Sequence, residues 1–145
     1  MTKLYAAYGS NINISQMVTR CPDAKFAGKG ILNNYHLVFR GRRNNAHATI
    51  ESKLGSFVPI ALWDITPICE SALDKHEGYP IYYRKDILAI ETDNGLQDAM
   101  IYIMTDGKEQ NNPNEVYFAT IYNGYRYFGF DTNIIKNATV KLWEF

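Results

Sequence analysis

The chain has 145 residues, and its 15 basic and 15 acidic side chains give a formal net charge of zero at pH 7. This length suits one domain with a real hydrophobic core, and the charge balance excludes the broad positive surface that binds nucleic acid. No apolar stretch reaches membrane-spanning length, and the chain opens in a strand pattern without a signal peptide. We therefore expect one domain over residues 1–145, in the cytoplasm, with neither a nucleic-acid nor a membrane partner.

The first predicted element is a short buried strand over Lys3–Tyr8, which turns at a glycine into a helix start. Asn13 can cap that helix, with Gln16 three residues on as in a capping box. Such a turn brings several unpaired backbone N–H groups together, and a nest of this kind binds a carboxylate or an oxyanion. Ser10 and Asn11 would add side-chain hydrogen bonds. An ordinary turn explains the same residues equally well.

The next stretch reads as short strands separated by turns. We expect turns at Pro22-Asp23, at Gly28-Lys29-Gly30 and at Gly55-Ser56. The strands between and after these turns are expected to cover 35–40, 46–51 and 57–65. A basic loop over 40–45 carries three arginines, and a solvated hairpin loop is a better interpretation of it than an anion site.

A helix with a defined start and end follows. Thr66 can serve as its N-cap with Pro67 at the first helical position, and Gly78 supplies the left-handed residue that ends it. Glu77 then lies in the last turn, where the negative end of the helix dipole disfavours an anion. Two interpretations stay open: a solvated glutamate, or a carboxylate with a raised pKa that accepts protons, with Tyr82 and Tyr83 lining its far side.

The remaining chain predicts a hairpin and a long helix. Strands over 83–91 and 97–105 flank the turn Thr92-Asp-Asn-Gly95, and the second is apolar on both faces, as in an interior strand. Asn112 is expected to cap the longest helix, which ends at Gly129. Its inward face comprises Phe118, Ile121, Tyr122, Tyr125 and Phe128. A strand is suggested over 139–143 within the last segment.

The sequence lacks the motifs of several common kinds of site. Cys21 and Cys69 are too few for a disulfide framework, and we expect both to be reduced, small core residues. His36, His47 and His76 show no metal-ligand spacing with them. There is no phosphate loop, nucleophile elbow or dinucleotide fingerprint. The sequence therefore predicts neither a metal nor a cofactor.

Two motifs carry a family resemblance. The segment Tyr5-Ala-Ala-Tyr-Gly-Ser-Asn11, followed by Leu73-Asp-Lys-His-Glu-Gly78 and Tyr83, resembles the γ-glutamylcyclotransferase family, and in particular its small bacterial AIG2-like members. Residues 48–50 resemble the family's central strand and residues 102–105 its late one. The resemblance covers nearly the whole chain, in order. The interval from Glu77 to Tyr83 differs from that of the animal dipeptide-cleaving enzymes.

The resemblance implies roles for individual residues. The catalytic acid and base of the family falls on Glu77. The segment that holds the glutamyl part of the substrate falls on Tyr8, Gly9 and Ser10, with Asn11 adjoining. The tyrosine after the second motif is Tyr83, and the substrate-contacting tyrosine early in the last long helix falls on Tyr117. These residues are the predicted site.

The resemblance also implies fold and reaction. The fold would be α+β, a small, highly curved sheet or barrel with flanking helices and a pocket at one mouth. The reaction would convert a small γ-glutamyl amide or peptide to 5-oxoproline and a free amine, without a cofactor. The alternatives are a non-catalytic module that binds a small acid, and a cyclotransferase acting on a γ-glutamyl group carried by a larger acceptor. The leaving amine and the oligomeric state stay open.

Overall fold

The structure is a computed structural model that describes residues 1–140. Five strands form its framework: β1 (Lys3–Ala7), β2 (Lys25–Arg42), β3 (Asn45–Ile65), β4 (Tyr83–Thr92) and β5 (Gly95–Met104). Its helical elements are a 3₁₀ turn, η1 (Ser10–Ile12), and the helices α1 (Ile14–Arg20), α2 (Pro67–Glu77), α3 (Glu115–Phe128) and α4 (Asn133–Asn137). Among these, no helix is both long and apolar enough to cross a membrane.

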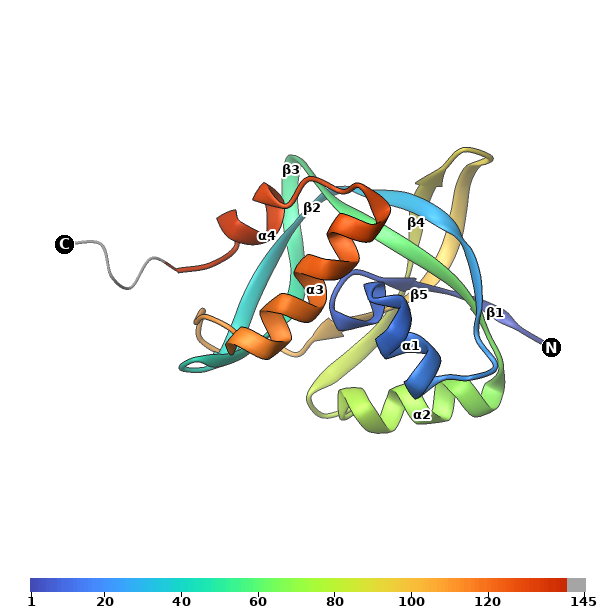
Figure 1. Cartoon of the computed structure of the whole chain (residues 1–145), viewed down its shortest axis with the longest axis horizontal. Coiled ribbons are helices and arrows are strands. Elements are labelled where there is room, and N and C mark those ends of the chain that lie inside the picture. Colours follow the sequence, from blue (N-terminus) through green and yellow to red (C-terminus); the bar gives the residue numbers. More distant parts are fainter. Residues whose placement is uncertain (141–145) are drawn as a thin grey trace.

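The strands close into a barrel in the order β1-β3-β2-β4-β5. Neighbouring strands are antiparallel except at the closure, where β1 runs parallel to β5 and Tyr5 pairs with Met100. Helices α1, α2 and α3 lie across one side of this barrel, the side that faces the viewer in Figure 1. The expected α+β fold with a highly curved sheet is therefore confirmed.

Strands β2 and β3 form one long hairpin, so the turns predicted at Gly28–Gly30 and at Gly55-Ser56 are wrong. The glycines act within the strands instead. Gly28 has φ +117° beside a register shift in the β2–β3 pairing, as at a bulge that bends the strand. A Cβ on Gly30 would lie 2.5 Å from Ile90 Cγ2, so glycine lets β4 approach β2 closely. The strands therefore curve at glycines rather than end there.

Two expectations near the C-terminus also need correction. Asn114, not Asn112, caps α3, and its side chain accepts from the amide of Tyr117 at 2.8 Å. Asn112 instead forms two hydrogen bonds with the backbone of Val140, of 2.8 and 2.6 Å. Of the strand suggested over 139–143, residues 139 and 140 are not in a strand, and the rest lies outside the described residues.

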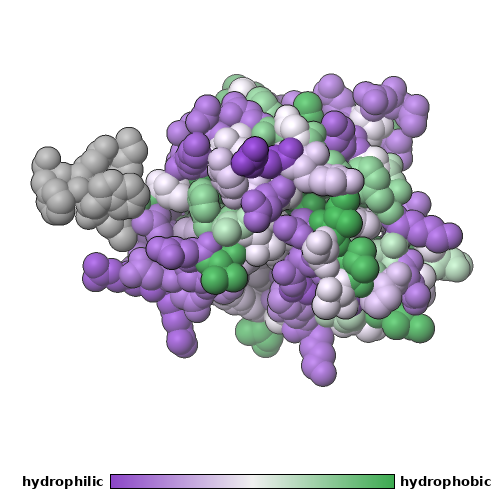
Figure 2. Space-filling model, in the orientation of Figure 1, coloured by the Kyte–Doolittle hydropathy of each residue, from purple (hydrophilic) through white to green (hydrophobic). Residues whose placement is uncertain are grey.

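The buried side chains form two clusters on the two faces of the sheet. One fills the barrel and includes the inward face of α3, with Phe39, Ile60, Ile101, Ile121 and Tyr125 almost fully buried. The other lies between the barrel wall and helices α1 and α2, and includes Met17, Trp63, Leu73 and Met100. On the face shown in Figure 2, hydrophobic residues form separate groups among polar ones. The second cluster packs α2 against the barrel.

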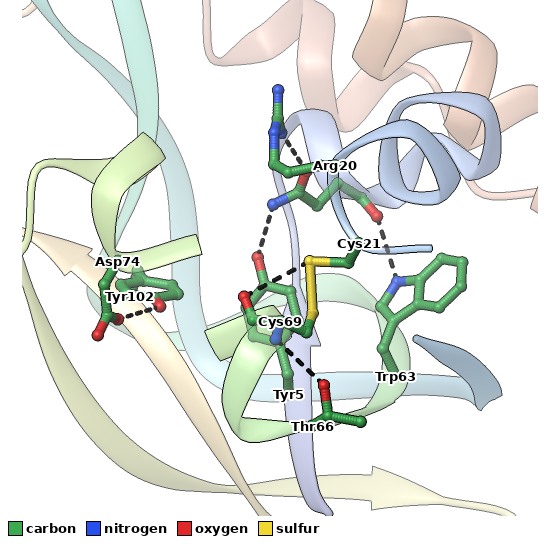
Figure 3. Close-up of a disulfide and its surroundings, with 9 residues drawn as sticks. Tyr5, Arg20, Cys21, Trp63, Thr66, Cys69, Asp74 and Tyr102 are labelled. Carbon is green, nitrogen blue, oxygen red and sulfur yellow. Dashed lines mark hydrogen bonds between the residues drawn. A yellow bond between two sulfur atoms is a disulfide. The ribbon is translucent and has the colours of Figure 1, made fainter. Parts of the chain in front are cut away.

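A disulfide joins the two helices of that second cluster. Cys21 is the C-cap residue that follows α1, and Cys69 lies in the first turn of α2, with the two Cα atoms 5.2 Å apart (Figure 3). The prediction of two reduced cysteines is therefore wrong. A single pair needs no framework, only a fold that brings two residues within bonding distance, and the sequence separation of 48 residues concealed that proximity.

Reducing this disulfide should destabilise the protein without unfolding it. A cross-link across 48 residues restricts the unfolded chain and contributes about 2–4 kcal/mol of stability. We expect a reductant to lower the urea midpoint accordingly, and the double variant Cys21→Ala/Cys69→Ala to show the lower midpoint with or without reductant. Equal midpoints for oxidised and reduced wild type would contradict a stabilising disulfide.

Candidate active site

A cavity of about 290 Å³ opens where η1, the start of β3, the end of α2 and the start of α3 converge. The whole predicted site lines it: Tyr8, Gly9, Ser10, Asn11, Glu77, Tyr83 and Tyr117. The lining also includes His47, Tyr82 and Tyr102. The volume lies at the small end of the range for ligand pockets, so it suits a compact group such as an amino-acid side chain with its α-carbon substituents.

Glu77 enters this cavity from the C-terminal end of α2. Thr66 caps the helix start by accepting from the Cys69 amide at 3.1 Å, and Gly78 ends the helix with φ +67°. Within residues 1–140 the Glu77 carboxyl group has no hydrogen-bond or ion-pair partner. Burial raises its pKa to about 7, and the positive charge of Arg20 opposes part of that rise. The group therefore titrates near neutral pH.

Polar bonds fix α2 against the sheet just before Glu77. The Tyr102 hydroxyl donates to Asp74 at 2.6 Å, as Figure 3 shows. Lys85 on β4 forms ion pairs with Asp74 at 2.8 Å and with Glu70 at 2.7 Å. Because these contacts lie on the same helix as Glu77, they set the position of its carboxyl group in the cavity.

The segment after β1 supplies backbone to the opposite wall. Leading amides of a 3₁₀ turn have no acceptor within the turn, so η1 presents N–H groups near its start. A Cβ on Gly9 would lie 3.4 Å from the Tyr117 hydroxyl and 3.5 Å from Ala48 Cβ, at ordinary contact distance. Gly9 therefore keeps this wall bare of side chain but is not required by a steric clash.

Asn11 is buried, and both the nitrogen and the oxygen of its side-chain amide form hydrogen bonds. Its amide nitrogen donates to the Tyr5 hydroxyl at 3.0 Å, and its amide oxygen accepts from the Arg20 guanidinium. Its backbone carbonyl accepts from the Trp63 indole at 3.2 Å. Asn11 therefore holds the η1 backbone in place, and its side chain has little left to offer a ligand.

At Ala48, tyrosine hydroxyls form the hydrogen bonds that a neighbouring strand would otherwise form with β3. The Ala48 amide donates to the Tyr117 hydroxyl at 3.0 Å, and the Tyr83 hydroxyl donates to the Ala48 carbonyl at 2.6 Å. The Tyr8 hydroxyl donates to the Tyr102 carbonyl at 2.6 Å. Tyr117 accepts in its bond, so its own proton stays available for a ligand. Burial raises the pKa of Tyr117, which keeps the hydroxyl protonated.

Sequence reasoning missed three residues around the cavity. His47 immediately precedes the strand motif at residues 48–50, and this adjacency could have drawn attention to it. Tyr102 is the first residue of the late-strand motif and contacts α2. Arg20 lies at the end of α1, and no local pattern placed it beside η1.

Replacing Tyr117 by phenylalanine should destabilise the protein. The change removes the acceptor of the Ala48 amide and leaves a buried N–H without a partner, at a cost of about 1–3 kcal/mol. Urea denaturation measures the loss. Tyr122→Phe on the same helix is the matched control and should change stability by less than about 0.5 kcal/mol. Equal stability of the two variants would show that the Ala48 bond contributes nothing.

The sequence comparison defines the class of protein to which this fold and cavity belong. Residues 5–121 match the model of the family described as γ-glutamyl cyclotransferase, AIG2-like. Because the match covers most of the chain, the protein belongs to this family. No curated protein sequence matches it.

Solved structures share the fold across the whole chain. A structure described as γ-glutamyl cyclotransferase has a TM-score of 0.86 at 23% identity, covering 100% of this chain and 91% of its own. A human protein has a TM-score of 0.84 at 24% identity over 99% of this chain and 90% of its own. A yeast γ-glutamyl cyclotransferase specific to glutathione has a TM-score of 0.67 at 11% identity, over 94% and 95%. At these identities the likeness is one of fold.

Proposed function

We propose that this protein cyclises γ-glutamyl amides to 5-oxoproline with release of the amine, and that Glu77 is the general base and then the general acid. The observation that carries the proposal is a carboxyl group that has no partner among residues 1–140, faces a small cavity and has its pKa raised by burial to about 7. A group that titrates near the working pH is suited to both accept and return a proton.

The first step is activation of the nucleophile. The α-amine of the γ-glutamyl group reaches the site as an ammonium and must lose a proton before it can attack. The ionised carboxylate of Glu77 takes that proton. The amine nitrogen then bonds to the side-chain carbonyl carbon of the same glutamyl group and closes a five-membered ring. Holding the amine and the carbonyl group in one small cavity accelerates the reaction, because the two groups are kept close together and oriented for attack.

The second step is departure of the amine. Attack places negative charge on the carbonyl oxygen, and the N–H groups near Gly9 and Ser10, with the free proton of Tyr117, are the donors available to it. Glu77, now protonated, gives its proton to the leaving nitrogen as the carbon–nitrogen bond breaks. The rings of Tyr8 and Tyr83 form walls that keep the glutamyl group in place.

Glu77→Gln should slow turnover strongly while keeping substrate binding. Glutamine preserves shape but cannot take a proton from an ammonium, so release of 5-oxoproline from a γ-glutamyl amide should fall by at least about 10²-fold. Calorimetry should still detect substrate binding. A variant that turns over at the wild-type rate would refute the role of Glu77. Binding without any turnover by the wild type would instead favour a non-catalytic module.

The stability of the same variant should rise with pH relative to wild type. The folded pKa of Glu77, about 7, exceeds the unfolded value of about 4.3. Between these values the folded state holds a proton that the unfolded state has lost, so raising the pH destabilises the wild type. Above pH 7 the variant should be more stable by about 1–2 kcal/mol, allowing for solvent screening of a partly exposed group, and at pH 4 equal. A destabilised variant at pH 8 would make Glu77 structural.

Turnover by the wild type should decline on acidification. Only the ionised carboxylate can act as base, so kcat/KM should fall tenfold per pH unit below about pH 7. Rate measurements across pH 5–9, paired with melting temperatures to exclude unfolding, provide the test. A flat profile down to pH 5 would rule out a base with this pKa.

A further inference from the structure

The cavity at Glu77 continues into an outer groove of about 560 Å³. The two spaces share Ser10, His47, His76 and Tyr117, which form the boundary between them. The groove is the adjoining space into which the leaving amine can extend from a γ-glutamyl group bound beside Glu77.

The groove contains a half-buried cation, Arg20, that makes no ion pair within the described residues. Arg20 lines it, and the guanidinium donates to the Asn11 side chain. Within residues 1–140 Arg20 forms no ion pair, and one bond leaves most of its five N–H donors unused. Burial lowers the pKa of Arg20, and the charge of Glu77, which is not in ion-pair contact, opposes part of that fall. Such a group is stabilised when a ligand brings the missing charge.

The neighbours of Arg20 in the groove are suited to the same ligand. His47 has an Nδ1 atom that is buried without a hydrogen-bond partner, so Nε2 is the ring nitrogen that can contact a ligand. Gln16 and Thr120 add hydrogen-bonding groups. Glu115 is the acidic side chain that lines the groove in the described chain, and it is exposed and makes no ion pair with Arg20.

We propose that Arg20 is a specificity-determining residue that binds a carboxylate carried by the leaving amine. The inference rests on the proposed function. It assigns to this chain a preference among γ-glutamyl amides: those whose amine bears an anionic group are turned over faster than neutral amides of the same size. A guanidinium can bind a carboxylate through two parallel N–H bonds, a geometry that a carboxamide cannot reproduce.

Two matched substrates test this preference. γ-Glutamylalanine and γ-glutamylalaninamide differ only in a terminal carboxylate or carboxamide. With 5-oxoproline as the readout, the wild type should favour the acid. In Arg20→Gln the loss of kcat/KM on the acid should exceed the loss on the amide by about 10- to 100-fold, as expected for hydrogen bonds to a charged group, and mainly through KM. Arg20→Lys should recover part of the preference.

Each alternative predicts a different pattern. Arg126→Gln, which removes an exposed arginine near the end of α3, is the charge-matched control and should keep the wild-type preference. Equal losses on both substrates in Arg20→Gln would place the contact of Arg20 on the glutamyl part or on folding, and would overturn the inference. A wild type that treats acid and amide alike would overturn it too. If the wild type released 5-oxoproline from neither substrate, the proposed function itself would fail.

Discussion

The site depends on which groups form hydrogen bonds with the backbone of β3 at Ala48. Buried backbone groups need partners, and along most of β3 the neighbouring strands provide them. At Ala48 the hydroxyls of Tyr83 and Tyr117 provide them instead. Side chains thus take the place of a strand, and the barrel can hold a cavity there without leaving the Ala48 amide and carbonyl unpaired. The rings of Tyr83 and Tyr117 also line the cavity. The tyrosines that allow the sheet to open at Ala48 therefore also form part of the cavity wall.

Helix α2 carries Glu77, the proposed catalytic residue, into this cavity. A carboxylate at the negative end of a helix and away from partners destabilises the folded state, and such a group persists only where the surrounding structure holds it. Here the disulfide fixes the start of the helix, the bonds of Asp74 with Lys85 and Tyr102 fix its middle, and Gly78 ends it. The stability lost at Glu77 is offset by contacts that lie elsewhere on the same helix.

The sequence predicted correctly those features that depend on residues close together along the chain. The cap at Thr66, the end at Gly78 and the turn before Gly95 depend on residues close in sequence, and all three are confirmed. The β2–β3 hairpin was divided wrongly because Gly28 looks the same in a turn and in a bulge until its partner strand is known. The disulfide and the cation at Arg20 depend on how α1 packs against its neighbours. The disulfide also removes the argument from cysteine for a reducing compartment.

The disulfide has a consequence for the unfolded chain as well as the folded one. Cys21 directly follows Arg20, and Cys69 lies about two helical turns before Glu77. Along the backbone the guanidinium and the carboxyl group belong to distant segments, but through the sulfur bridge the tether between them is short. An oxidised chain therefore keeps these two charges near each other even when every helix has melted, and searches a much smaller volume to bring them together again.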